Sequence, residues 1–78
     1  MEMRGMIEYL VKSLVDDPEH VLITETAGDD CTAFEVRVAA GDTGKVIGRG
    51  GRIASAIRQV AKAAAMKEKR KIYVDIIG

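Results

Sequence analysis

The residues best suited to ligand chemistry lie in one short stretch, residues 46–53, which reads Val-Ile-Gly-Arg-Gly-Gly-Arg-Ile. Three glycines within four positions are costly unless the backbone needs positive φ or a close approach to a ligand. We expect this turn to open a helix, with the free amides of Gly51, Arg52 and Ile53 at the positive end of its dipole. With Arg49 and Arg52 adding charge, the pattern predicts a cradle for a phosphate group.

A structural interpretation of the same stretch is also open, because a glycine turn between two helices can serve the fold alone. Two nucleotide-binding motifs are excluded. A P-loop needs a glycine where Ala39 stands and a hydroxyl residue where Val46 stands. The dinucleotide fingerprint needs a small residue in place of Ile53.

Length and composition limit the class of protein. The chain has 78 residues, which is enough for one domain with a core of marginal stability. No apolar run approaches the roughly 18 to 20 residues that span a bilayer, and no signal peptide precedes the first helical pattern. Cys31 is the only cysteine and His20 the only histidine, so we expect no disulfide, metal site or cofactor. The sequence predicts a soluble cytoplasmic protein without a membrane partner.

The charge of the chain is distributed unevenly although its net value is zero. Residues 1–39 carry three basic and nine acidic side chains, whereas residues 40–78 carry nine basic and three acidic ones. Such asymmetry indicates an anionic partner for the second half. Simple solvation of helix faces would explain the basic run at residues 67–71 equally well.

Hydrophobic periodicity predicts six elements in the order α-β-β-α-α-β. Their expected ranges are a helix at 2–16, strands at 21–26 and 33–39, a short helical turn at 41–47, a helix at 51–68 and a strand at 71–77. Asp42 or Thr43 is expected to cap the short helix. The long helix is expected to bury Ile53, Ile57, Val60, Ala61 and Ala64. The last strand returns by a two-helix crossover and should lie parallel to the second.

The stretch at 46–53 resembles the signature of the KH-domain family, in which one isoleucine precedes a G-x-x-G loop and another follows it. Here the loop is 48–51, with Ile47 before it and Ile53 after it. The element order resembles the type II, prokaryotic form of the domain, and the whole chain is similar to small stand-alone bacterial RNA-binding proteins of this family. The resemblance implies an α+β fold, a single KH domain over residues 1–78, with a three-stranded mixed sheet covered on one face by three helices.

The family also implies a function, which is to hold about four single-stranded nucleotides against the loop and an apolar groove. Carried over to this chain, Gly48, Arg49, Gly50 and Gly51 form the clamp. The supporting residues implied beside it are Lys45, Ile47, Arg52, Ile53, Val36 and Val38. Gly50 occupies one of the two variable positions, so Arg49 is the only charge inside the loop, and backbone donors should dominate.

The resemblance implies a post-transcriptional regulator or RNA chaperone that forms a homodimer or acts with a larger KH-containing partner. Phe34 is assigned to the core, and with only three aromatic residues we expect no aromatic stacking platform. The alternative is a dimerising protein-interaction adaptor with incidental nucleic-acid binding, in which outward alanines such as Ala56 or Ala63 line the interface. An enzyme is not expected, because the sequence offers no nucleophile–base pair or metal-ligand cluster.

Overall fold

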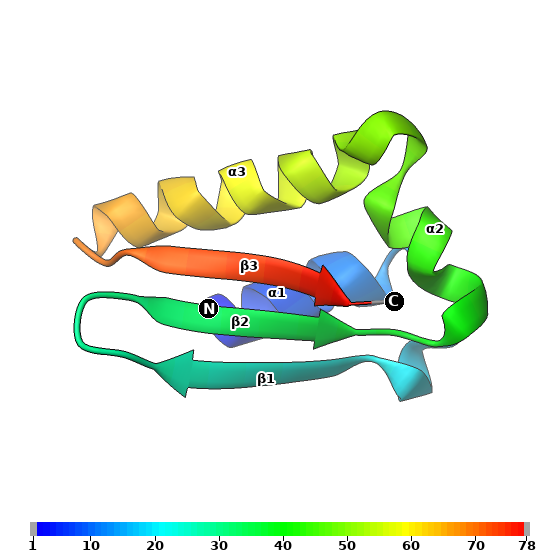
Figure 1. Ribbon diagram of the computed structural model, residues 1–78, viewed down its shortest axis with the longest axis horizontal. Coiled ribbons are helices and arrows are strands. Elements are labelled where there is room, and N and C mark those ends of the chain that lie inside the picture. The colour runs from blue at the N-terminus through cyan, green and yellow to red at the C-terminus, as the bar shows by residue number, and fades with distance from the viewer. Residues whose placement is uncertain (1, 78) are drawn as a thin grey trace.

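The computed structural model describes residues 2–77, and the predicted elements are present in the predicted order (Figure 1). The helices are α1 (Met3–Lys12), α2 (Thr43–Ile47) and α3 (Arg52–Lys67), and the strands are β1 (Leu22–Ala27), β2 (Thr32–Arg37) and β3 (Ile72–Ile77). The α+β class inferred from the sequence is therefore confirmed. No helix within residues 2–77 has the length and apolar character needed to cross a bilayer.

The strands form one mixed sheet in the order β1-β2-β3. β1 pairs antiparallel with β2, with Ile23 opposite Val36, and β2 pairs parallel with β3, with Val36 opposite Ile76. The expected parallel return of the last strand is confirmed. Because β2 is the central strand, its alternate side chains on the helix side lie beneath the helices.

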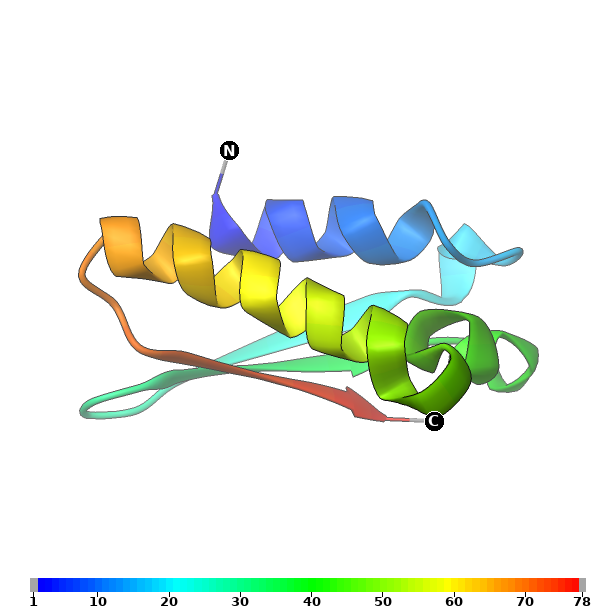
Figure 2. The ribbon, with the colours of Figure 1, turned by 90° about the horizontal axis from the view of Figure 1, so that it is seen from above.

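The helices cover one face of this sheet. Figure 2 shows α1 and α3 side by side, and α2 lies near the end of the sheet at which β2 and β3 finish (Figure 1). The core between the layers comprises Met3, Ile7, Val11, Ile23, Phe34, Val36, Val46, Ile57, Ala61, Ala65, Ile72 and Val74. Every strand contributes to this core from one face, as alternation predicts. The core assignment of Phe34 is confirmed by its 1% exposure.

The first helix is shorter than its hydrophobic pattern suggests. α1 ends at Lys12, and the Ser13 hydroxyl then donates to the Tyr9 carbonyl at 2.7 Å. A side chain that bonds to the backbone in this way competes with continued helix. Leu14 and Val15 still pack against the core, which explains why periodicity extended the helix over them.

The buried stripe of α3 also differs from the expected one. It consists of Ala54, Ile57, Ala61 and Ala65, while Val60 is 48% exposed. The expectation that Val60 is buried is wrong, because the stripe follows the small residues that let the helix approach the sheet. Alanine at these positions removes side-chain bulk between the helix and the strands.

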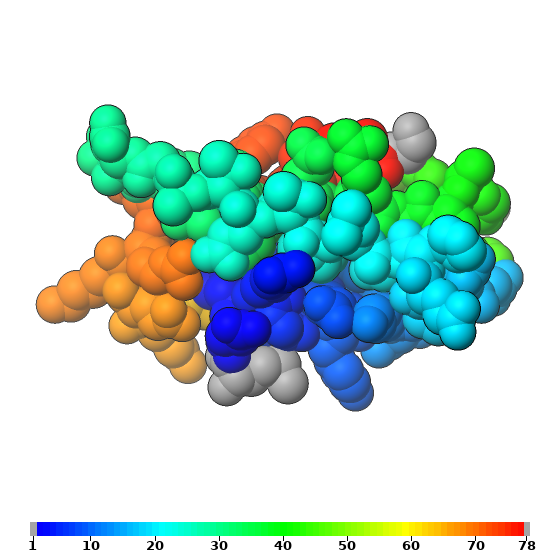
Figure 3. Space-filling view, turned by 90° about the horizontal axis from the view of Figure 1, so that it is seen from below, coloured from blue at the N-terminus to red at the C-terminus, as the bar shows by residue number. Residues whose placement is uncertain are grey.

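α3 joins the two ends of a molecule that measures 34 × 23 × 20 Å. The glycine loop and α2 lie at one end, and the β1–β2 turn and the α3–β3 connection lie at the other (Figure 1). Figure 3 shows this separation, with the green segment after β2 at the right and the orange end of α3 at the left.

Candidate nucleic-acid interface

The glycine loop uses backbone conformations that other residues avoid. Gly48 has φ 77° and ψ 172°, Gly50 has φ 64° and ψ 18°, and Gly51 has φ 77° and ψ 14°. Positive φ puts a Cβ too close to the following carbonyl, and glycine alone adopts the Gly48 conformation readily. The predicted need for glycine freedom is therefore confirmed at all three positions.

The three glycines face different surroundings. A Cβ on Gly48 would lie 2.6 Å from Cγ1 of Ile53, so its backbone packs directly against that side chain. A Cβ on Gly50 or Gly51 would meet nothing within 4 Å. Gly48 therefore holds the loop against α3, while Gly50 and Gly51 leave the outer surface of the loop open to a ligand.

Two of the three amides expected to be free at the loop, those of Gly51 and Arg52, form hydrogen bonds to the backbone. The Gly51 amide donates to the Gly48 carbonyl at 3.1 Å, and the Arg52 amide donates to the Arg49 carbonyl. Within residues 2–77, the Arg49 and Gly50 amides donate to no backbone carbonyl. Because the chain makes a tight turn before α3 begins, the amides of Arg49 and Gly50, which precede the expected positions, are available to an anion.

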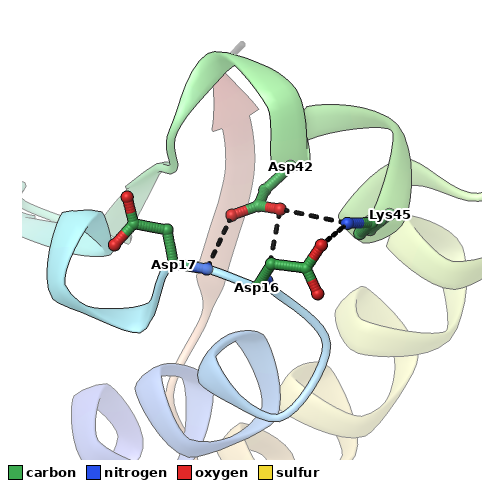
Figure 4. A network of polar contacts seen from close by, with 4 residues as sticks. All are labelled: Asp16, Asp17, Asp42 and Lys45. Carbon is green, nitrogen blue, oxygen red and sulfur yellow. Dashed lines mark hydrogen bonds and ion pairs between the residues drawn. The ribbon is translucent and has the colours of Figure 1, made fainter.

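The cations around the loop fall into two groups. Arg49 and Arg52 are exposed and form no ion pair within residues 2–77. The Lys45 ammonium, in contrast, pairs with Asp16 and lies 3.5 Å from Oδ1 of Asp42 (Figure 4). Positive charge at the loop therefore comes from the two arginines, and Lys45 is already neutralised by carboxylates.

The Asp42 carboxylate joins the segment after α1 to the base of α2 (Figure 4). It accepts hydrogen bonds from the Asp16 amide at 3.2 Å and the Asp17 amide at 3.0 Å. The expected capping of α2 is wrong, because neither Asp42 nor Thr43 forms a side-chain cap bond there. Asp42 instead satisfies the backbone of a segment that is distant in sequence, and it is only 4% exposed.

This setting changes the acidity of Asp42. Burial raises the pKa of the carboxyl, but hydrogen bonds from the Asp16 and Asp17 amides and from the Lys45 ammonium outweigh that effect, so the pKa lies below its ordinary value. The same pairing with Asp16 raises the pKa of Lys45. Both groups are held in their charged forms at neutral pH.

Only some of the residues predicted to line the apolar groove lie at the surface. Ile47, Ile53 and Val38 are half-buried near the loop, but Val36 is 0% exposed in the core. Val36 lies on the covered face of the central strand and is removed from the predicted set of contact residues. A shallow groove of about 240 Å³ does include Ile53, but α1 and α3 form it, through Leu10, Ala56 and Val60 among others.

Sequence reasoning missed Arg58, which lies between α3 and the free edge of β3. Its Nε donates to the Val74 carbonyl at 2.9 Å, and its side chain is half-buried. The position borders the buried stripe, since it follows Ala54 by four residues and precedes Ala61 by three. An arginine at such a border commonly packs its aliphatic stem along the apolar surface and keeps its guanidinium group near the solvent. This was the sequence signal that could have identified Arg58.

We predict that Gly48→Ala lowers the free energy of unfolding by about 2–5 kcal/mol, from backbone strain and the clash with Ile53. Gly41→Ala is the matched control, because a Cβ there meets nothing within 4 Å. The control should change the free energy of unfolding by less than about 0.5 kcal/mol in a urea titration. Equal stabilities of the two variants would show that the Gly48–Ile53 contact is unimportant.

We predict that Asp42→Asn lowers the melting temperature at pH 7. We also expect the melting temperature of this variant to fall less steeply than that of the wild type as the pH is lowered. Because the folded-state pKa of Asp42 is depressed, its stabilising effect is present above the ordinary pKa of an aspartate and is lost as pH falls through the folded value. Thermal melts between pH 7 and pH 3 measure this. Asp29→Asn, in the exposed β1–β2 turn, should melt like the wild type, and a wild-type pH profile in Asp42→Asn would contradict the assignment.

Comparison with known proteins identifies close relatives over the whole length of the chain. It is 51% identical over 75 residues to the RNA-binding protein KhpA of Clostridium perfringens, covering 96% of this chain and 100% of the relative. The RNA-binding protein KhpA of Borreliella burgdorferi is 44% identical over 72 residues, covering 92% of this chain and 88% of the relative.

Solved structures show the same fold. Aquifex aeolicus Era bound to GDP·AlF4⁻ superimposes with a TM-score of 0.65 at 15% identity, and so does Era in complex with MgGDPNP and nucleotides 1506–1542 of 16S ribosomal RNA. The match covers 95% of this chain but only 29% and 28% of those chains. At this identity the likeness concerns the fold alone.

A family model described as "KhpA/KhpB, KH domain" matches residues 4–76, which is nearly the entire chain. This match agrees with the element order, the mixed sheet and the glycine loop between α2 and α3. The chain belongs to the KhpA/KhpB KH-domain family.

Proposed function

We propose that this chain is an RNA-binding protein that holds short single-stranded segments against the loop at residues 48–51. The observation that carries the proposal is the open loop surface, where, in the described part of the chain, the Arg49 and Gly50 amides have no carbonyl partner and Arg49 and Arg52 form no ion pair. Relatives of similar length are named as RNA-binding proteins, which supports the same function.

The clamp is proposed to act on the RNA backbone. A phosphate oxygen accepts hydrogen bonds from the Arg49 and Gly50 amides, and the open space beside Gly50 and Gly51 lets it approach closely. The Arg49 and Arg52 guanidinium groups then add charge from either side. Because these contacts involve backbone and phosphate, they are tolerant of base sequence.

The bases are proposed to lie along the free edge of β3 rather than over β2. Ile76 is half-buried on this strand, and Arg58 spans from α3 to the Val74 carbonyl beside it. The guanidinium Nη groups of Arg58 can donate to base edges while its Nε is held in place. Val38 and Ile47 supply apolar contact near the end of the sheet where the loop lies.

The cellular role that follows is a post-transcriptional regulator or RNA chaperone. A clamp with so few phosphate contacts binds weakly alone, so a second copy or a KH-containing partner would raise affinity by linking two sites. Such a partner is proposed on the same grounds and is consistent with a family model that covers both KhpA and KhpB.

A second candidate function is self-association as an adaptor, and the groove between α1 and α3 favours it. Leu10, Ala56 and Val60 line this groove, and Val60 is half exposed at its rim. A second copy could bury these side chains. The groove lies on the α1 side of α3 and not along the β3 edge proposed for the bases, although Arg52 and Ile53 beside the loop also line it.

We predict that Gly50→Asp lowers affinity for single-stranded RNA about tenfold or more, because a carboxylate then lies where a phosphate must bind. Gly50→Asn is the matched control, since asparagine has the same shape without charge and both residues tolerate the left-handed region. Fluorescence anisotropy with a labelled oligonucleotide measures both. If the folded Asp and Asn variants bind RNA equally, the clamp is not at this loop.

We predict that Ala56→Glu abolishes any dimer detected by light scattering, because it places a charge in the groove between α1 and α3. Ala63→Glu introduces the same charge at an exposed position of α3 that does not line this groove. The particle mass that light scattering gives for Ala63→Glu should equal that of the wild type. A monomeric wild type with intact RNA affinity would exclude the adaptor.

A further inference from the structure

A second hollow lies at the end of the molecule opposite the glycine loop, and we call it the far-end depression. It has a volume of about 460 Å³, and its apolar floor consists of Ala65, Met66, Ile72 and Tyr73. Lys62 on α3 and Lys71 before β3 stand at its rim. The predicted clamp does not use any of these residues.

Two of the apolar side chains of the depression are large and exposed, whereas Ala65 and Ile72 are buried. Met66 is 75% exposed and Tyr73 is 53% exposed. The sequence argued against a stacking platform because the chain has few aromatic residues, but the structure leaves this tyrosine available at the surface. Aromatic faces and neighbouring cations are the combination on which single-stranded nucleic acids bind.

The charges at the rim favour an anionic occupant. Lys62 and Lys71 are exposed and form no ion pair within residues 2–77. Arg70, which also lines the depression, is occupied by Glu25 and Glu68 at 4.0 and 3.5 Å. Asp30 is the one carboxylate among the lining residues, and within residues 2–77 it forms no ion pair with either lysine, so the two lysines outnumber it at the depression.

The position of the depression connects it to the proposed clamp. α3 leads directly from one to the other, and Arg58, Lys62 and Met66 follow one another at four-residue spacing along it. Residues four apart share a helix face. With a rise of 1.5 Å per residue, Arg52 and Met66 are about 21 Å apart along the axis, a span that requires several further nucleotides.

We propose that the far-end depression is a second RNA subsite, in which the strand held at the glycine loop continues along the α3–β3 seam. Bases contact Met66 on α3 and the exposed Tyr73 ring at the edge of β3, and Lys62 and Lys71 bind the flanking phosphates. The proposal rests on the proposed RNA-binding function and extends its footprint beyond the four nucleotides implied by the KH resemblance.

The experiment compares random-sequence single-stranded RNAs of four and twelve nucleotides by anisotropy over a range of salt concentrations. A longer strand also offers more overlapping sites, so the decisive comparison is between variants on the same oligonucleotide. The double variant Lys62→Gln/Lys71→Gln loses two phosphate contacts, each of which contributes roughly 0.7 to the slope of log affinity against log salt concentration. For the twelve-mer this slope should therefore become shallower by about 1.4, and for the four-mer it should not change. Tyr73→Ala should weaken only the twelve-mer, roughly fivefold or more, and Tyr73→Phe should restore it.

The matched control is Lys67→Gln/Lys69→Gln, which removes the same charge from neighbouring exposed positions that do not line the depression. Equal losses in the two double variants would show non-specific attraction and overturn the proposal. If the wild type binds the four-mer but all variants bind the twelve-mer like the wild type, the second subsite is absent while the clamp stands. If the wild type binds neither RNA, the proposed function and the subsite both fail.

Discussion

The contact between the Gly48 backbone and the Ile53 side chain is the constraint on which the site depends. A Cβ at this glycine would lie 2.6 Å from that isoleucine, so the end of α2 and the start of α3 can approach only if residue 48 is glycine. The close approach forces a tight turn, and the turn consumes the Gly51 and Arg52 amides. Within residues 2–77 the outer amides at Arg49 and Gly50 have no backbone carbonyl partner, and they are the proposed donors to a ligand.

A second constraint holds α2 in place from the opposite side. The Asp42 carboxylate binds two amides of the segment after α1, and Lys45 bridges the same carboxylate to Asp16. Asp16, from the acidic first half of the chain, therefore neutralises a basic residue of the second half at the surface of the fold. Among residues 2–77 Arg49 and Arg52 have no ion-pair partner, which reconciles zero net charge with a locally positive surface.

The fold could be predicted from the sequence because its periodic signals are local. Alternation in β2 and β3, the alanine-rich pattern of α3 and the flanking of the loop by Ile47 and Ile53 all appear within a few residues of sequence. The type II arrangement followed from their order, and the mixed sheet confirms it.

The site was less predictable because its details depend on contacts between distant segments. Whether Val36 or Ile76 reaches the surface depends on which strand is central, and alternation alone does not specify that. The role of Asp42 required a partner 25 residues away, so local capping rules assigned it wrongly. The roles proposed for Arg58 and Tyr73 depend on the α3–β3 seam, which forms only when the chain returns from α3 into the sheet.

Amide chemical-shift mapping of the intact chain with a single-stranded RNA tests the central claim most directly. It reports each backbone N–H separately, and the loop amides are the proposed donors. The account predicts that the largest shifts occur at residues 49–52 and continue to residues 74–76 on β3. Shifts confined to the groove between α1 and α3, or an absence of shifts at Arg49 and Gly50, would contradict it.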